Sequence, residues 1–422
     1  MDSIIGQLSS QKVWEEFLAY RLVKGRFNWH EFEEADEFVE QEDYISAVHE
    51  VVSGNGLGVP HRMVLNKMGT GKKRIVYSYG RDEMAVLKLL AHLLYKYDDS
   101  FSPNCYAFRR GVKATDAVTQ VSRIVRGKNL WAYKLDISNY FNSISVPLLL
   151  EQLKVLLADD PRLYDFFNEM LSDDRAEFNG EIIHEPRGAM AGVPTASFLA
   201  NVYLMAMDWY FHDQGVIYAR YSDDIIVFAE DYETLKVYIV KLKEFISKFR
   251  LEVNESKEKI FRPSEPYEFL GFKCLDNQID IADSALDKMK GKIRRKMKAI
   301  LRWKQRNGIS DERAMRRFID YFNRRFYDDF VPGSLSWARW YFPMVNTTDG
   351  LKAIDHYFQQ CVRALSTGRH SKANFRVSYD KMKKLGLRSL VHEYYNLRKG
   401  LPVLAFFNRR NGACEEGKKV IY

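Results

Sequence analysis

Two adjacent carboxylates lie between two strand-like segments, and this feature most constrains the fold of the chain. The sequence Tyr-Ser-Asp-Asp at residues 221–224 separates residues 215–220 from residues 225–229, and both flanking segments are rich in β-branched and aromatic residues. Asp tolerates tight-turn conformations, so the pattern predicts a β-hairpin with two acids at its tip. Two carboxylates about 4 Å apart repel by roughly 4 kcal/mol at an effective dielectric near 20. A bound Mg²⁺ or Mn²⁺ ion would relieve that repulsion.

A solvated surface turn is the alternative for these two acids. The chain contains five Asp-Asp pairs, and four of them are typical of exposed loops or helix ends. Residues 172–174 have the same Ser-Asp-Asp sequence, but turn-forming residues follow them and no buried strand does. The dipeptide alone therefore leaves both interpretations open.

A third acid follows a predicted strand upstream of the hairpin. Residues 130–135 are apolar and aromatic enough for a buried strand, which would end at Asp136. An acid at that place, beside the hairpin, would complete a cage of three carboxylates for two cations held about 3.5–4 Å apart. The alternative is that Asp136 or Ser138 caps the helix expected to follow.

The order of these segments resembles the successive palm motifs of reverse transcriptases. The matching segments are residues 136–141 (Asp-Ile-Ser-Asn-Tyr-Phe), 188–204 (beginning Gly-Ala-Met-Ala-Gly-Val-Pro), 221–224, 251–257 and 268–272 (Glu-Phe-Leu-Gly-Phe). Upstream, residues 72–74, Asp82 and residues 105–111 resemble the fingers motifs. The resemblance spans residues 61–275. In character these motifs resemble those of bacterial enzymes, namely retrons, group II intron proteins and the abortive-infection or defence-associated reverse transcriptases.

The resemblance implies a role for each acid. Asp136 and Asp223 would bind two metal ions, Mg²⁺ or alternatively Mn²⁺, and Asp224 would be the more peripheral third ligand. Together they would neutralise the triphosphate of a dNTP and activate a primer 3′-hydroxyl for in-line attack. The implied reaction is nucleotidyl transfer with release of pyrophosphate.

Four further matched residues would contact the nucleotide or the leaving group. Phe141 would be an aromatic steric gate against a ribose 2′-hydroxyl, or else an ordinary core aromatic. Lys72 and Arg74 would bind phosphates, although a solvated basic turn, and Lys73 in place of Lys72, are alternatives. Lys257 would protonate the leaving pyrophosphate, or be only a surface lysine.

The segment around Gly192 departs from the usual family pattern, Gly-x-Pro-Gln-Gly-x-Pro-x-Ser-Pro. An ungapped match places Met190 at the first Pro, Ala191 at the Gln and Ser197 at the last Pro, while Gly192 and Pro194 are retained. The missing Gln would help to position the nucleotide against its template, so the departure disfavours ordinary processive copying. Gly192 still allows the backbone to approach a nucleotide closely.

The composition is typical of a soluble nucleic-acid enzyme. The chain has 422 residues, 46% of them hydrophobic, which is enough for more than one lobe with a core. Its net charge of +8 favours an anionic partner. We find no 18-residue apolar run for a membrane span and no signal-peptide pattern. Four scattered cysteines argue against structural zinc and disulfides, so we expect a reducing, cytoplasmic setting.

Positive charge is concentrated after the last palm motif. Residues 285–328 contain fifteen Lys or Arg against five Asp or Glu, a surplus of ten. A solvated helix face is the alternative, but aromatic residues alternate with the charge, which favours a helical thumb that grips the template–primer backbone. We expect Arg294, Arg295, Arg316 and Arg317 to contact nucleic acid.

The expected fold class is α+β, a right-hand polymerase with an antiparallel palm sheet, fingers, and a helical thumb and C-terminal region. The expected parts are an N-terminal helical region (1–60), fingers and palm (61–280), a basic thumb (281–335) and a C-terminal helical extension (336–422).

The expected function is RNA-directed DNA synthesis from dNTPs, in bacterial anti-phage defence, with a structured non-coding RNA as template and DNA as primer and product. Untemplated or protein-primed DNA synthesis is one alternative. A non-catalytic RNA-binding module on a polymerase scaffold is the other, and the three acids disfavour it.

Overall fold

The computed structural model describes residues 3–24, 29–52, 56–66, 73–327, 336–368 and 376–401. The chain divides into two compact units, Met1–Ala282 and Asp283–Tyr422. All three β-sheets belong to the first unit. Lys72, which we expected to bind phosphate, lies outside the described residues.

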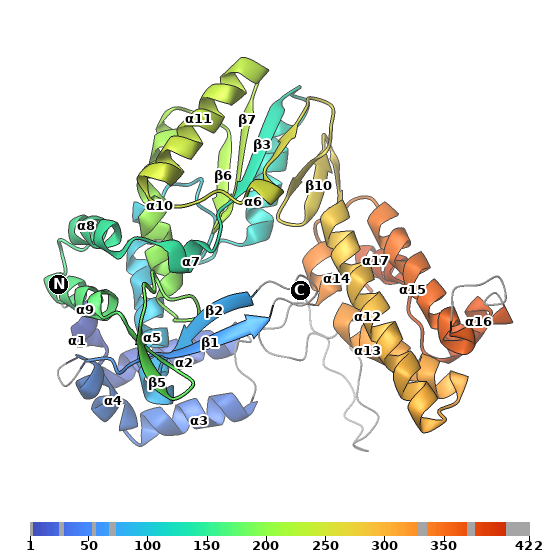
Figure 1. The fold of residues 1–422 in the computed structure, drawn as a ribbon, viewed down its shortest axis with the longest axis horizontal. Helices are drawn as coiled ribbons and strands as arrows, with labels where there is room; N and C mark the ends of the chain where they lie inside the picture. The colour runs from blue at the N-terminus through green and yellow to red at the C-terminus, as the bar shows by residue number, and fades with distance from the viewer. Residues whose placement is uncertain are drawn as a thin grey trace. The chain divides into compact units, whose positions relative to one another are not determined.

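A four-stranded antiparallel sheet carries the three acids (Figure 1). Its strands, in spatial order, are β6 (Tyr218–Tyr221), β7 (Asp224–Ala229), β3 (Trp131–Asp136) and β8 (Lys259–Phe261). Residues 225–229 are all buried, as expected for a central strand with both faces covered. Helix α11 (Tyr232–Lys248) packs against β3 and β7, and helices α6 (Ala114–Val125) and α10 (Ala196–Asp213) pack against β6.

A second sheet pairs a hairpin with strands from later in the chain. Its order is β2 (Lys73–Ser78), β1 (His61–Asn66), β4 (Arg175–Phe178) and β5 (Glu181–His184). Tyr77 and Arg62 both donate to one oxygen of Glu185, at 2.7 and 2.8 Å, which joins the hairpin to the β4–β5 segment. A third sheet has the order β11 (Gln278–Ile281), β10 (Phe272–Leu275) and β9 (Tyr267–Phe269).

The other described elements of the first unit are helical. Before the sheets come α1 (Ile4–Gln7), α2 (Gln11–Val23), α3 (Trp29–Glu40) and α4 (Asp43–Val52). Between the strands lie α5 (Arg81–Leu93), η1 (Leu94–Ser100), α7 (Tyr140–Ser143), α8 (Val146–Leu156), α9 (Pro161–Ser172) and η2 (Glu255–Lys257). Helix α2 packs against α5.

The described part of the second unit is helical. It contains α12 (Asp283–Asn307), α13 (Asp311–Tyr327), α14 (Trp337–Tyr341), α15 (Asp349–Thr367), α16 (Tyr379–Lys384) and α17 (Leu390–Arg398). Helices α12, α13 and α15 pack on one another through buried apolar residues such as Ile293, Phe318 and Phe358. None of the helices in the described part of the chain is both long and apolar enough to cross a membrane.

These elements confirm the predicted α+β class and the antiparallel sheet that carries the acids. One alternative for Asp136 is excluded, because the residue at the N-cap position of α7 is Asn139, in the left-handed conformation at φ +46°, rather than Asp136 or Ser138. The expected division into four parts stays a prediction.

Candidate functional site

The hairpin and β3 bring the three acids to one end of the sheet. Asp224 pairs with Tyr221 across the hairpin and with Asp136 across β3. Ser222 and Asp223 form the two-residue turn, and Ser222 adopts φ +62°, as expected in a tight hairpin. The carbonyl oxygen of Asp223 accepts a hydrogen bond from the Ile137 amide at 3.2 Å, which ties the turn to the end of β3.

Two of the acids have lysine partners. The Lys257 ammonium donates to both oxygens of Asp136, one of them at 2.6 Å, and the Asp136 side chain is only 4% exposed. The Lys134 Nζ lies 3.0 Å from Oδ1 of Asp224. Lys257 comes from η2, whose approach is fixed by a 2.7 Å hydrogen bond from the Asn254 amide to the Asp136 carbonyl. Lys257 was expected to face a leaving group, and the structure places it on an acid.

Asp223 differs from its two neighbours. Burial raises the pKa of its carboxyl, and the negative charges of Asp136 and then Asp224 raise it further, while Lys257 lowers it. Among the described residues, no cation lies within ion-pair distance of Asp223. The turn therefore holds an acid that is close to two like charges and is not neutralised by a partner of its own.

The donor types of these acids suit a hard divalent cation, because carboxylate oxygens are the ligands such ions prefer. In the part of the chain that the structure describes, no three His, Cys, Asp or Glu side chains are arranged to hold a metal ion. Asp136 and Asp224 contact lysine ammonium groups instead. The carboxylates are suitable ligands for a metal ion. Binding one would require the side chains of Asp136 and Asp224 to turn away from Lys257 and Lys134.

A buried ion pair lies directly behind the hairpin. Arg220 is 0% exposed, and its Nε lies 2.8 and 3.0 Å from the two oxygens of Asp208 on α10. The same guanidinium donates to the Ser222 carbonyl and to Asn201 Oδ1, each at 3.3 Å. The Tyr218 hydroxyl completes the pair by donating to Asp208 at 2.8 Å. Sequence reasoning missed this network, although a charged residue inside an apolar strand was a signal for it.

Phe141 lies in α7, five residues after Asp136. Its ring is partly buried against the core and meets the edge of the Phe108 ring at 6.0 Å. The Phe141 carbonyl accepts from the Ala189 amide at 2.8 Å, and a side chain at Gly188, where φ is +57°, would come within 2.4 Å of that carbonyl. Gly188 is thus needed for close packing under Phe141. Both interpretations of Phe141, steric gate and core aromatic, remain compatible with this position.

The Gly192 loop is fixed to strand β2. The Tyr77 amide donates to the Ala191 carbonyl at 2.8 Å, and a side chain at Gly192, where φ is +110°, would lie 2.6 Å from the Tyr77 carbonyl. The Asn142 amide group bridges the two elements, donating to the Ile75 carbonyl at 3.0 Å and accepting from the Ala191 amide at 2.9 Å. The close approach at Gly192 is thus to the protein's own backbone. Asn142, which sequence reasoning missed, holds the loop in place.

Two of the predicted phosphate-binding residues, Arg74 and Lys73, lie on strand β2, to which the Gly192 loop is hydrogen-bonded. Arg74 is exposed on β2, next to Ile75 whose carbonyl Asn142 contacts. The Asn142 hydrogen bond therefore holds strand β2 in place next to Arg74. Lys73 begins the same strand and is also exposed.

The four predicted nucleic-acid contacts are all exposed on two helices of the second unit. Arg294 and Arg295 lie on α12, and Arg316 and Arg317 lie on α13. Arg317 stands over the Trp303 ring at 5.3 Å.

Other cations of these helices crowd one another. Burial lowers the pKa of Lys292, and the positive charges of Arg325, Arg295 and Lys288 lower it further. Such a cluster favours binding of an anion.

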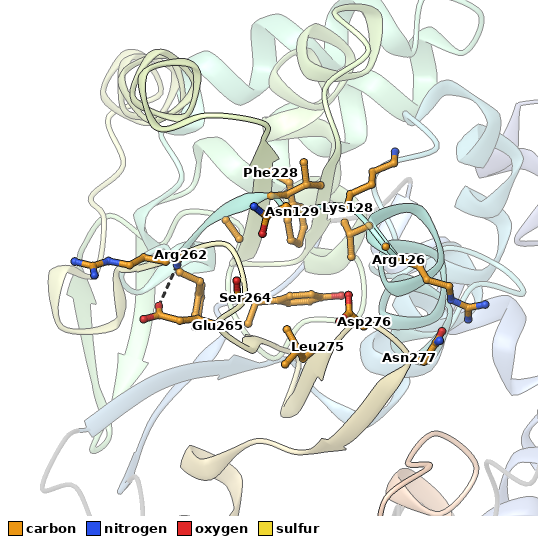
Figure 2. A pocket seen from close by; sticks show the side chains of 16 residues that line it. Arg126, Lys128, Asn129, Phe228, Arg262, Ser264, Glu265, Leu275, Asp276 and Asn277 are labelled. Atoms are coloured by element: carbon orange, nitrogen blue, oxygen red, sulfur yellow. Dashed lines mark hydrogen bonds between the residues drawn. The ribbon is translucent and has the colours of Figure 1, made fainter.

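A cavity of about 500 Å³ lies at the other end of the acid-bearing sheet (Figure 2). It includes Leu130, just before the first residue of β3, whereas Asp136 is the last residue of that strand. The rings of Phe228 and Tyr267 meet edge to face at 5.0 Å in its wall. In Figure 2 the charged groups of Arg126, Lys128 and Arg262 point away from its centre. This cavity is separate from the acids.

Residues 65–274 match the family Reverse transcriptase (RNA-dependent DNA polymerase). Over 213 residues the chain is 21% identical to the COX1/OXI3 intron 1 protein of Saccharomyces cerevisiae. That match covers 49% of this chain and 24% of the yeast protein, so the chain spans about a quarter of its relative.

Solved structures similar to this chain include two telomerases. One is telomerase from Candida albicans with a fragment of telomeric RNA, at 11% identity and a TM-score of 0.45, covering 88% of this chain and 72% of that one. The other is apo telomerase from Candida tropicalis lacking its C-terminal domain, at 13% identity and a TM-score of 0.42, covering 58% and 60%. TM-scores below 0.5 do not bear on what this chain binds. Residues 65–274 are therefore a segment that matches the reverse transcriptase family, and the paired acids lie within it.

Proposed function

We propose that this chain is an RNA-directed DNA polymerase whose catalytic acids are Asp136, Asp223 and Asp224. The observation that carries the proposal is the cross-strand pairing of Asp136 with Asp224, which places Asp223 beside both. Burial is the largest cause of the raised pKa of Asp223, and the negative charges of Asp136 and Asp224 raise it further, as expected in a carboxylate cluster that binds cations. Structural ion pairs would satisfy all three acids, whereas here Asp223 has no such partner among the described residues.

The metal ions of this proposal are Mg²⁺, with Mn²⁺ as a substitute. When bound, they supply charge neutralisation and a more acidic primer 3′-hydroxyl. Asp136 and Asp223 would hold them, and Asp224 would support their charge from the side. Lys257 is 57% exposed on its side of Asp136, so its ammonium can leave the carboxylate and donate a proton to the departing pyrophosphate.

The nucleotide would be a dNTP placed between Phe141 and strand β2. Phe141 would exclude a ribose 2′-hydroxyl by crowding, and Gly188 keeps the Phe141 backbone fixed for that role. Arg74 and Lys72 would bind the triphosphate. The Asn142 bridge supports Arg74 by holding β2 against the Gly192 loop.

The partner would be a structured non-coding RNA held by α12 and α13, with DNA as primer and product. Exposed arginines and crowded cations on these helices support binding of a polyanion, since counterion release favours it. We also propose a cytoplasmic bacterial enzyme acting in anti-phage defence, a role that rests on family resemblance alone.

Untemplated or protein-primed synthesis at the same acids is a second candidate function. Ala191 stands where relatives have a Gln that positions the nucleotide against the template, and this residue is only 4% exposed. A buried methyl group cannot make that polar contact. Template control would then have to come from other residues.

The test is primer extension by the purified protein on an RNA template, with a DNA template and no template as the other arms. We expect Mg²⁺-dependent incorporation whose sequence follows the RNA, and omission of one dNTP should stop extension at the first complementary position. Extension that ignores template sequence would support the second candidate. A folded protein that incorporates no nucleotide in any arm would leave only the non-catalytic RNA-binding alternative.

A further inference from the structure

Lys134 is a charged side chain on the acid-bearing sheet that no catalytic role explains. It precedes Asp136 by two residues on β3, so both side chains leave the same face of the sheet. In the register of β3 and β7, Asp136 lies opposite Asp224, and Lys134 lies opposite Ile226. The Lys134 ammonium reaches diagonally to Asp224, where Nζ and Oδ1 are 3.0 Å apart. Strand β3 therefore carries both a proposed metal ligand and a counter-ion for the neighbouring acid.

The two lysine–acid pairs of this site differ in how firmly the lysine is held. Lys257 lies on the three-residue η2 and its side chain is 57% exposed, so water can solvate its ammonium when it leaves Asp136. Lys134 lies within β3, between β7 and β8, and its side chain is only 19% exposed. An ammonium in that position would lose its compensation if Asp224 turned away, which is costly for a largely buried charge.

The surroundings of Lys134 offer no second acid in the part of the chain that the structure describes. Its neighbours across the sheet are Ile226 on β7 and Lys259 on β8. The Lys259 Nζ lies over the Phe261 ring at 4.6 Å. Without Asp224, Lys134 would face a like charge on the adjacent strand and no carboxylate, which is unfavourable. The pair of Lys134 with Asp224 should therefore persist when Lys257 is displaced.

This difference divides the three acids. Asp223 has no cation within ion-pair distance among the described residues, and the lysine on Asp136 is the exposed one. A divalent ion can bind Asp136 and Asp223 by displacing one exposed lysine, whereas recruiting Asp224 would also break the less exposed pair. Mg²⁺ is usually bound through one or two carboxylates together with substrate phosphates. Two protein carboxylates would leave positions for the oxygens of a triphosphate.

We propose that Lys134 is a positioning residue that keeps Asp224 beside the metal ions rather than bound to them. Asp136 and Asp223 are then the protein ligands, and Lys134 sets the number of carboxylates on the ions. The inference rests on the proposed function, because nucleotidyl transfer gives the metal ions their use.

The test measures Mn²⁺ binding to the whole protein without nucleotide or nucleic acid, from the electron paramagnetic resonance signal of the free ion. Two double variants each remove one lysine–carboxylate pair and leave the net charge unchanged. They are Lys134→Met/Asp224→Asn and Lys257→Met/Asp136→Asn. We expect the first to bind Mn²⁺ within about twofold of wild type and the second to bind at least about tenfold more weakly, since only Asp136 is a ligand.

Single substitutions separate positioning from packing. Lys134→Met frees Asp224 and should tighten Mn²⁺ binding about tenfold, because it leaves an unpaired carboxylate next to the ions. Lys134→Arg keeps a cation for Asp224 and should bind Mn²⁺ with the affinity of wild type. Thermal melts in EDTA would establish that each protein is folded.

Equal losses of Mn²⁺ affinity in the two double variants would overturn the inference, because Asp224 would then be a ligand like Asp136. So would a folded Lys134→Met protein with the Mn²⁺ affinity of wild type. Neither result affects the proposed function, which is measured separately by Mg²⁺-dependent primer extension.

Discussion

The acid-bearing sheet and the helices α12 and α13 handle charge in opposite ways. At the sheet, Asp136 and Asp224 have lysine partners, and the hairpin is backed by the fully buried Arg220–Asp208 pair. On α12 and α13, Lys292 faces other cations, and the four predicted arginines are exposed. The first region uses internal pairs to fix the geometry of a few acids. The second keeps positive charge available, which is useful only if an external anion neutralises it.

Breaking the buried Arg220–Asp208 ion pair should have a large effect on the free energy of unfolding. Arg220→Ala would leave Asp208 buried and uncompensated, so we expect a loss of about 3–5 kcal/mol in the free energy of unfolding. Arg220→Met/Asp208→Leu removes both charges and should cost less. Urea unfolding of the three proteins would measure this. An Arg220→Ala protein as stable as wild type would show that the hairpin does not depend on the Arg220–Asp208 pair.

Removing exposed positive charge from α12 and α13 should instead leave the free energy of unfolding unchanged and weaken RNA binding. Changing Arg294, Arg295, Arg316 and Arg317 to Gln should flatten the plot of log affinity against log salt by up to about 0.7 for each phosphate of single-stranded RNA that the protein no longer neutralises. The matched control is Lys236→Gln/Lys241→Gln on α11, because these lysines already have acidic partners. Filter binding at several salt concentrations is the measurement. The same slope in both variants would place the RNA surface elsewhere.

Phe141 allows a test of whether the region near the acids also selects the sugar. Phe141→Ala should raise the ratio of rNTP to dNTP incorporation about tenfold or more, because truncation relieves crowding at the 2′-hydroxyl. Single-nucleotide incorporation with each substrate would measure the ratio. An active variant with an unchanged ratio would make Phe141 a core residue only.

The smallest expected effect concerns the pH dependence of stability. The folded-state pKa of Asp223 is raised, so its ionised form destabilises the fold above that pKa, and the cost disappears below the unfolded value. Asp223→Asn should therefore be more stable than wild type at pH 8, and the difference should shrink as the pH falls.

Asp173 supplies a control of opposite sign. Hydrogen bonds from Arg175 lower its pKa, so its ionised form stabilises the fold, and that contribution is lost as the pH falls through the folded pKa. Asp173→Asn should be less stable than wild type at pH 8. Urea midpoints between pH 5 and 8 test both signs, and the same sign in the two variants would contradict the account of Asp223.

Local patterns were enough to predict the hairpin and the end of β3. Residues 225–229 form a buried strand, and Asp136 ends its own strand, because short-range composition determines both. The partners of the acids could not be predicted this way. Lys257 lies 121 residues from Asp136, so only the folded chain brings them together.

The supporting contacts were missed for the same reason. Asn142 is an ordinary polar residue in the sequence, and its bridge to Ile75 spans 67 residues. Arg220 next to the hairpin was visible, but its partner Asp208 lies on another element. Asn139 precedes α7 in the left-handed conformation and makes no side-chain capping hydrogen bond, so capping preference alone did not predict where this helix begins.

The most direct test of the central claim compares two Ser-Asp-Asp sequences of the same chain. Asp223→Ala/Asp224→Ala should reduce Mg²⁺-dependent dNTP incorporation at least about 10³-fold, because it removes carboxylates that would stabilise charge in the transition state. Asp173→Ala/Asp174→Ala removes the same dipeptide where its partners are Arg175 and His184, and should retain incorporation. Substantial incorporation by a folded Asp223→Ala/Asp224→Ala protein, or equal losses in both variants, would contradict the assignment of the catalytic acids.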